Sequence, residues 1–273
     1  MPREFSLAHL TLLNCNPPDL IEVAARAQFQ YVSLRPLAVT PNEPKYPLGT
    51  DKALLAQTKK RLKDTGVRLL DIELARILPN VNLKDYVPAM EAAAELGGRF
   101  LLCSVWTPDT DYALERFIEL CDLARPFGLD ACLEFVTFAD VADLTQAARF
   151  VRAAARPNAK ICIDTLHFYR SRCSLAELDQ LPQDWFPFQQ LCDAEAAIPD
   201  TREGLIETAR ENRNFLGEGG LDVAGLVNRL PPMPYAIEVP NRKLALELSP
   251  LDFARRALAT ANSYLDAHPR PHR

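Results

Sequence analysis

The sequence predicts an α/β protein of the (β/α)8 barrel class, and three observations carry that prediction. Eight short apolar runs alternate with segments of helical pattern, which is typical of a parallel sheet. Several of these runs end in a carboxylate, at the edge where such a barrel carries its site. The 273 residues suit one barrel of about 250 residues, and no linker divides them. We therefore expect a single barrel domain over residues 1–273.

The expected strands are apolar runs, several of them rich in β-branched or aromatic residues. They are Phe5–Leu13, Tyr31–Arg35, Val67–Ile77, Phe100–Trp106, Asp130–Val136, Ala159–Asp164, Phe186–Ala194 and Pro234–Pro240. An open, doubly wound sheet is the alternative arrangement. It favours a glycine-rich turn after the first strand, and Asn14–Pro18 contains no glycine.

The segments between the strands are amphipathic or alanine-rich and predict helices. They are Pro18–Gln28, Asp51–Thr65, Leu83–Leu96, Asp111–Ala124, Val141–Ala155, Leu175–Leu181, Arg202–Asn212, Val223–Leu230 and Pro250–His268. Asp51 is the expected N-cap of its helix, and Gly66 follows the end of that helix. The proline-rich segment Pro36–Leu48 is too long for a simple connector and is a candidate lid. Pro269–Arg273 is expected to form a loose tail.

Composition excludes several classes of function. The net charge of −5 argues against a nucleic-acid surface, which needs a basic patch. No apolar run approaches the roughly 20 residues that span a bilayer, and Met1–Phe5 does not begin a signal peptide. The seven cysteines show no paired spacing, which is typical of reduced thiols in a cytoplasmic protein. We expect a small-molecule substrate, no nucleic-acid or membrane partner, and leave self-association open.

Polar side chains at the ends of four neighbouring strands carry the chemistry. Glu134, Asp164 and Glu238 offer carboxylates, and Gln190 offers an amide oxygen. Because side chains alternate along a strand, Cys132, Cys162 and Ala236 place small residues one layer below three of them. A buried carboxylate is costly unless it is paired or holds a metal. An all-oxygen set suits a hard divalent ion such as Mn²⁺ or Mg²⁺.

Such an ion can hold two oxygens of a hydroxy-ketone and stabilise an enediolate. Glu134 and Glu238 would approach the bound carbon from opposite sides, so that one removes a proton and the other returns it. The alternative for any single carboxylate is that it caps a loop or pairs with an arginine. That alternative explains the four strand ends together less well.

These residues resemble the xylose-isomerase-like barrel superfamily, specifically its sugar phosphate isomerases/epimerases. The resemblance covers nearly the whole chain, and its most specific parts are Leu-Glu134-Phe, Ile-Asp164-Thr-Leu-His167-Phe, Gln190-Leu-Cys-Asp193-Ala, Leu-Gly217-Glu-Gly219-Gly-Leu-Asp and Ile-Glu238-Val-Pro. It implies that Glu134, Asp164, Gln190 and Glu238 bind the metal, a divalent ion (Mn²⁺, Mg²⁺ or Co²⁺), and that His167 contacts the substrate. Many ketose epimerases of this group have histidine where Gln190 stands. Glutamine is more like the branches that dehydrate 3-dehydroshikimate or inosose.

Further candidates face the substrate. His167 is a catalytic and substrate-binding candidate, since three residues past Asp164 it is expected on the βα turn at the mouth; a bond to a loop carbonyl is the alternative. His9 is more typical of a satisfied core histidine. Arg35, Glu73 and Arg76 lie at or near the ends of the second and third strands, and an arginine there can fork a carboxylate or phosphate. Arg35, Glu73 and Arg213 complete the predicted substrate-binding set. For Arg202 and Arg210 a surface ion pair is the favoured reading, and the glycine loop at 217–220 is weak evidence of phosphate binding.

Four functions can be compared with these sequence features. The favoured one is a metal-dependent isomerase or epimerase of a small sugar derivative, within carbohydrate metabolism. The alternative is a metal-dependent lyase that removes water from a cyclic hydroxy-ketone such as 3-dehydroshikimate or an inosose. An abasic-site endonuclease would need more histidines and a basic face. A non-catalytic binding barrel would leave the buried carboxylates unexplained.

Overall fold

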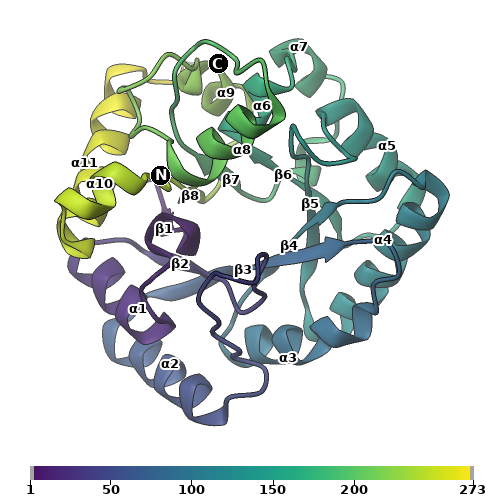
Figure 1. Cartoon of the computed structure of the whole chain (residues 1–273), viewed down its shortest axis with the longest axis horizontal. Helices are drawn as coiled ribbons and strands as arrows, with labels where there is room; N and C mark the ends of the chain where they lie inside the picture. Colours follow the sequence, from purple (N-terminus) through teal and green to yellow (C-terminus); the bar gives the residue numbers. More distant parts are fainter. Residues whose placement is uncertain (1–2, 271–273) are drawn as a thin grey trace.

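The computed structural model describes residues 3–270 and shows a closed barrel of eight parallel strands, which confirms the predicted fold class. Each strand pairs with its sequence neighbours, and β1 closes the ring against β8. The strands are β1 Phe5–Leu7, β2 Tyr31–Leu34, β3 Arg68–Ile77, β4 Phe100–Val105, β5 Asp130–Glu134, β6 Ala159–Asp164, β7 Gln189–Leu191 and β8 Tyr235–Ile237. Figure 1 shows the ring encircled by helices.

The helices follow the strands around the outside of the ring. They are α1 Pro17–Arg26, α2 Lys52–Thr65, α3 Val87–Glu95, α4 Thr110–Ala124, α5 Leu144–Ala154, α6 Thr165–Arg170, α7 Leu175–Leu178, α8 Arg202–Glu211, α9 Val223–Arg229, α10 Arg242–Glu247 and α11 Pro250–Ala267. Short 3-10 helices cover His9–Leu12, Leu83–Tyr86, Arg125–Phe127 and Gln183–Trp185. The Asp51 carboxylate accepts from the Leu54 amide at the start of α2, and Gly66 (φ 75°) ends the helix, as predicted.

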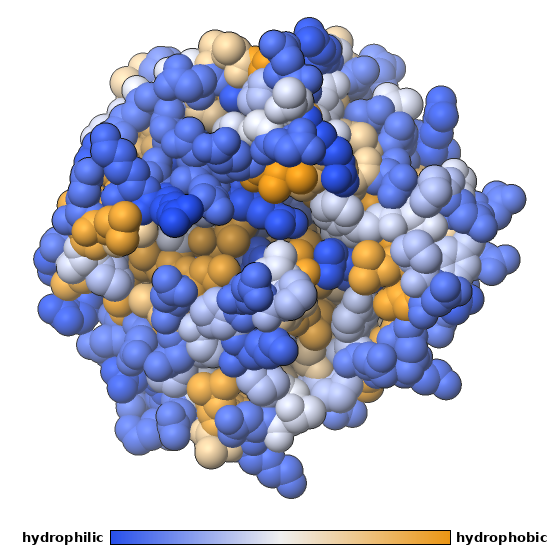
Figure 2. Space-filling view, in the orientation of Figure 1, coloured by the Kyte–Doolittle hydropathy of each residue, from blue (hydrophilic) through white to orange (hydrophobic). Residues whose placement is uncertain are grey.

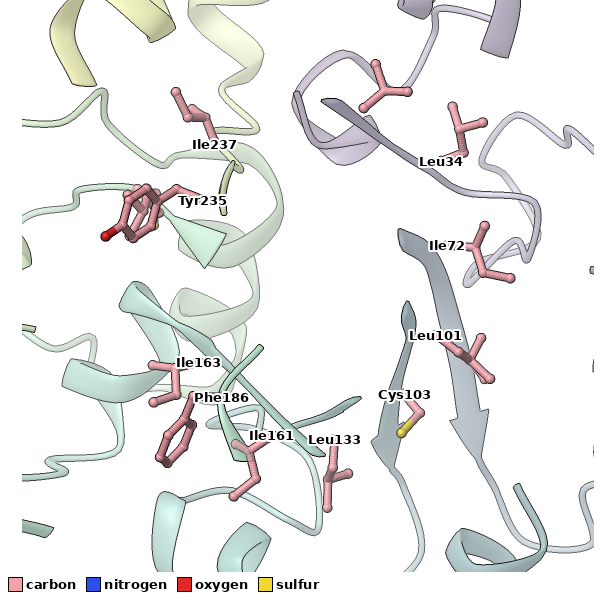
Figure 3. Packing of buried hydrophobic residues seen from close by; sticks show 14 of the residues in the cluster. Leu34, Ile72, Leu101, Cys103, Leu133, Ile161, Ile163, Phe186, Tyr235 and Ile237 are labelled. Atoms are coloured by element: carbon pink, nitrogen blue, oxygen red, sulfur yellow. The ribbon is translucent and has the colours of Figure 1, made fainter. Parts of the chain in front are cut away.

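The main apolar core lies between the ring and the helices. Figure 3 shows Ile72, Leu101, Leu133 and Ile161 pointing outward from successive strands. A smaller apolar cluster fills the inside of the barrel and includes Cys132, Cys162 and Ala236. These three small residues are the ones expected one layer below the carboxylates. They therefore leave room above them for polar side chains at the mouth.

Several element boundaries differ from the predicted ones. The first strand ends at Leu7, so His9 lies in a 3-10 helix rather than on a strand. The seventh strand is only Gln189–Leu191, the fifth helix begins at Leu144, and helices α6 and α10 were not expected. Local apolarity cannot separate a strand from the helical turn that directly follows it. Residues 271–273 of the expected tail lie outside the described residues.

Two further expectations concern cysteines and membranes. All seven cysteines are free thiols, and Cys103, Cys121, Cys132, Cys162 and Cys192 are buried. Burial raises the pKa of each of these five thiols, which keeps them protonated and inert. Within residues 3–270, no helix has the length and apolarity needed to cross a bilayer.

Candidate metal and substrate site

A cavity of about 390 Å³ opens at the carboxyl ends of the strands. This volume falls within the usual range of small-molecule sites, about 300–1,000 Å³. Figure 2 shows one face of the molecule, where hydrophilic and hydrophobic side chains together border a recessed centre. Its polar lining includes the predicted site residues Arg35, Glu73, Glu134, His167, Arg213 and Glu238. Asp164 and Gln190 lie just beneath it and contact the residues that line it.

Asp164 ends β6 and begins helix α6. One carboxylate oxygen accepts from the amides of Leu166 (2.7 Å) and His167 (3.4 Å). This N-cap explains why a helix begins directly after the strand, and it corrects the expectation that His167 lies on a turn. The other oxygen lies 2.6 Å from Nη1 of Arg213, and the side chain is fully buried. The cap fixes the direction in which Asp164 faces the site.

Glu238 and Gln190 meet inside the barrel mouth. The Gln190 amide donates to Oε1 of Glu238 at 3.1 Å and accepts from the thiol of Cys162 at 3.6 Å. Oε2 of Glu238 lies 3.0 Å from Nη1 of Arg213. Arg213 thus bridges two of the predicted ligands. Its Nε donates to the Ala209 carbonyl of α8, which orients the guanidinium.

Glu134 and His167 leave donor atoms free toward the cavity. Glu134 ends β5, and no hydrogen bond or ion pair engages its carboxylate within residues 3–270. Nδ1 of His167 faces the amide (3.4 Å) and hydroxyl (3.2 Å) of Thr137. Because an amide can only donate, this contact favours a proton on Nε2. His167 would then offer an N–H donor to a bound molecule.

Burial and Arg213 set the protonation of the carboxylates. Burial raises the pKa of Glu134 well above its usual range, and the charges of Asp164 and Glu238 add to this. Burial likewise raises the pKa of Glu238 to about 8, although Arg213 opposes it. Burial acts in the same direction on Asp164, but Arg213 outweighs it and holds the pKa of Asp164 below its usual value. Burial lowers the pKa of His167 to about 4, so the ring is neutral.

The donor set fits a hard divalent cation. Three buried carboxylates face one deep guanidinium, so ionising all three leaves negative charge that only another cation would balance. Ligand atoms of Glu134, Asp164 and His167 lie within 4.8 Å of one another. The predicted set of Glu134, Asp164, Gln190 and Glu238 is linked only in part, since Gln190 contacts Glu238 and Arg213 contacts both Asp164 and Glu238. Those four residues could hold an ion only if Nη1 of Arg213 moved away from Asp164 and Glu238.

The opposite wall of the cavity comes from β2, β3 and the loop between β2 and α2. Arg35 and Glu73 form a buried ion pair at 2.6 Å, and Nε of Arg35 and Oε1 of Glu73 have no hydrogen-bond partner within residues 3–270. The candidate lid contributes Val39, Thr40 and Glu43 to the cavity lining. His9 supports this wall from behind, with Nδ1 bonded to the Arg35 amide and Nε2 to the Cys15 carbonyl. His9 is thus a satisfied core histidine, as expected.

The glycine loop serves a structural purpose. The Asp193 carboxylate accepts from the amides of Gly217, Gly219 and Leu221 at 3.0–3.1 Å. A side chain at Gly219 would meet Oδ1 of Asp193 at 2.4 Å, so only glycine fits. Because Asp193 already uses these amides, they do not form a free phosphate cradle.

Sequence reasoning was wrong about two arginines and missed one carboxylate. Neither Arg202 nor Arg210 forms an ion pair within residues 3–270, although surface ion pairs were expected, and Arg210 lines the cavity.

Asp71 of β3 is fully buried inside the barrel beside Ser33. Ser33 and Asp71 are register partners on neighbouring strands, and this pairing is the signal that could have revealed it. A register shift at Leu70 hides that signal in the sequence.

Comparisons with known proteins agree with the barrel fold. The sequence profile described as xylose isomerase-like TIM barrel matches residues 21–262. Among curated proteins, no sequence matches the chain significantly. Many solved structures share the fold.

Three of these structures illustrate the range. A crystal structure of the IolI protein with a zinc atom has 17% identity and a TM-score of 0.78, covering 97% of this chain and 99% of that one. D-allulose 3-epimerase from Methylomonas sp. in complex with D-allulose has 17% identity and a TM-score of 0.72, covering 96% and 97%. The probable 3-DHS dehydratase AsbF of petrobactin synthesis from Bacillus anthracis has 13% identity and a TM-score of 0.71, covering 95% and 98%. At these identities the likeness is one of fold.

Proposed function

The chain belongs to the xylose isomerase-like TIM barrel family, and on this premise we propose that it is a divalent-metal-dependent isomerase or epimerase of a small sugar derivative. The observation that carries the proposal is the convergence of three strand-end carboxylates, Glu134, Asp164 and Glu238, at one cavity. Such a set suits a reaction that needs a cation and a proton-transfer step.

Each residue has a proposed role in this reaction. Glu134 removes a proton next to the substrate carbonyl, and Glu238 returns it from the other side, with the roles exchanged for the reverse reaction. His167 donates from Nε2 to a substrate oxygen, Glu73 binds a hydroxyl through its unpartnered Oε1, and Arg35 donates from its unpartnered Nε to a substrate oxygen. Before an ion binds, Arg213 orients Asp164 and Glu238 and favours their ionised forms.

The proposed metal ligands are Glu134, Asp164, Gln190 and Glu238, for Mn²⁺, Mg²⁺ or Co²⁺. When bound, the ion would polarise the carbonyl and favour negative charge on its oxygen. In the alternative donor set of Glu134, Asp164 and His167, the histidine would bind the ion and could not donate to the substrate. The Thr137 amide at Nδ1 supports the first set, because a ligating Nε2 requires the proton on Nδ1.

A dehydratase is the second candidate, and Gln190 is the observation that favours it. The resemblance places histidine there in many ketose epimerases and glutamine in dehydratase branches. A 3-DHS dehydratase is also among the similar folds. Both reactions begin with proton removal next to a carbonyl, and they differ in whether a β-hydroxyl leaves.

A metal-loaded activity screen across ketoses, inososes and 3-dehydroshikimate tests the proposal. An isomerase or epimerase should interconvert one of the ketoses or inososes without a new ultraviolet band. A dehydratase should give a conjugated, ultraviolet-absorbing product. The Glu134→Gln variant, prepared in parallel, controls for contaminating activity. Equal turnover by the wild type and this variant would contradict both candidates.

We also propose a single domain over residues 1–273 and a cytoplasmic location. The free thiols support the location, since a reducing compartment keeps buried cysteines unpaired.

A further inference from the structure

Three arginines without a carboxylate partner within residues 3–270 lie at or near the cavity: Arg210 lines it, and Arg76 and Arg202 bond to carbonyls of residues that line it. Arg76 donates to the Val39 carbonyl at 2.6 Å, and Arg202 donates to the Phe138 carbonyl at 3.0 Å. Arg210 of α8 lines the cavity and has no hydrogen bond or ion pair in this part of the chain. Arg202 and Arg210 are exposed, so solvent screens much of their mutual repulsion, and an anion at the cavity mouth would compensate the remainder.

The carboxylates near the rim are engaged elsewhere. Glu43 accepts from the amides of Val39 and Thr40, and its nearest cation is Arg35 at 3.9 Å. Glu211 lines the cavity, but it pairs with Arg242 at 3.5 Å. Desolvation lowers the pKa of Arg210, and the positive charges of Arg35, Arg76 and Arg202 contribute to this, against the opposing charge of Glu43. Of Arg76, Arg202 and Arg210, only Arg210 has a guanidinium with no hydrogen-bond or ion-pair partner in the described chain.

Arg35 provides an independent observation on the same cavity. Its side chain is only 7% exposed, and its Nε is a buried donor with no partner in the described chain. A buried donor without an acceptor costs free energy, and a ligand oxygen in the cavity would remove that cost. The cavity thus offers one unsatisfied buried guanidinium N–H and one uncompensated guanidinium at the rim.

We propose that Arg210, supported by Arg76, Arg202 and Arg35, forms a subsite for an anionic group of the substrate. The ligand chemistry is an oxyanion, either a carboxylate or a phosphate ester, which guanidinium groups bind through paired N–H donors. The inference rests on the proposed function, because it places the reacting carbon at the deep carboxylates and the anion at the rim. A neutral sugar would leave the rim charges without a partner.

Calorimetric titration of the metal-loaded enzyme with two matched ligand pairs tests the subsite. One pair is D-fructose 6-phosphate and D-fructose, and the other is 3-dehydroshikimate and a neutral inosose. The first pair examines a phosphate and the second a carboxylate. The proteins are the wild type, Arg210→Gln and Arg255→Gln. Arg255 lies on α11, is exposed, and does not line the cavity, so its replacement removes the same charge elsewhere.

At least one anionic ligand should bind the wild type about 10-fold or more tightly than its neutral partner. Arg210→Gln should abolish most of that preference, and Arg255→Gln should retain it. The pair that shows the preference identifies the anion. The subsite is overturned if neither pair shows a preference, if Arg210→Gln keeps it, or if Arg255→Gln loses it equally.

Turnover separates this inference from the proposed function. Turnover of a neutral ketose without any anion preference would refute the subsite and leave the isomerase proposal standing. An anion preference that depends on Arg210, in a protein that turns over no tested ligand, would support the subsite and contradict the isomerase proposal.

Discussion

Two groups of buried carboxylates lie inside the same barrel, and their surroundings differ. On the β5–β8 side, Glu134, Asp164 and Glu238 lie at or beside a cavity and share the Arg213 guanidinium. On the β1–β3 side, Asp71 is sealed in the barrel beside Ser33, which lies 3.0 Å from Ser6 through its hydroxyl. Burial and the Glu73 charge raise the pKa of Asp71 well above its usual range. Burial raises the pKa of Glu134 and Glu238 as well, so the two groups differ in their access to the cavity and in the Arg213 guanidinium, which Asp71 lacks.

The largest difference between the two groups should appear in turnover. Replacing Glu134 or Glu238 by glutamine keeps an oxygen ligand but removes proton transfer, so each variant should lose about 10²–10⁴-fold in turnover while retaining metal. Asp71→Asn should stay near the wild-type rate, because Asp71 touches neither the cavity nor the proposed ligands. Steady-state kinetics on the substrate found by the activity screen measures this. Full activity in both glutamine variants would refute the two-glutamate mechanism.

Arg213 tests whether the cavity carboxylates depend on their cation. Arg213→Gln leaves Asp164 and Glu238 without their shared guanidinium, and removing one partner of a buried pair costs about 3–5 kcal/mol. Metal-free Arg213→Gln should therefore unfold at lower denaturant than Arg255→Gln, and Arg213→Lys should lose less. Added Mn²⁺ should stabilise Arg213→Gln more than the wild type. Equal stability of Arg213→Gln and Arg255→Gln would show that Arg213 does not stabilise the buried carboxylates.

His167 should show a smaller effect. His167→Ala removes one proposed donor to the substrate, so kcat/KM should fall about 10-fold or more with metal affinity nearly intact. His167→Gln, which keeps an N–H donor, should recover part of the loss. Kinetics and metal titration on the same preparations measure both quantities. A loss of metal in His167→Ala would instead favour the donor set that includes this histidine.

Asp71 should show the smallest effect, and only as a dependence on pH. Because its folded pKa is raised above the unfolded value of about 3.9, the Asp71 contribution to stability is present below that pH and is lost as pH rises. Asp71→Asn does not titrate, so its stability relative to the wild type should improve as the pH rises above about 4. Denaturant unfolding at several pH values measures this. A constant difference would show that Asp71 is ionised in the folded protein.

The sequence reveals the two carboxylate groups unequally. Glu134, Asp164 and Glu238 were predicted because each ends an apolar run above a small residue, and that pattern is local. Asp71 was missed because a register shift in β3 interrupts the alternation that would have placed it inside. The contacts of Arg213 with Asp164 and Glu238 depend on the path that the chain takes after α8, and no local sequence pattern predicts that path. The same applies to Arg210, whose position at the rim follows from the packing of α8 above the ring.

The most direct test of the account is the metal content of three proteins loaded with Mn²⁺ and freed of excess ion. The proteins are the wild type, Gln190→Ala and His167→Ala, measured by elemental analysis. We predict one ion per chain in the wild type, retention in His167→Ala and clear loss in Gln190→Ala. A wild type that retains no ion, or a His167→Ala variant that loses it while Gln190→Ala keeps it, would contradict the proposed ligands Glu134, Asp164, Gln190 and Glu238.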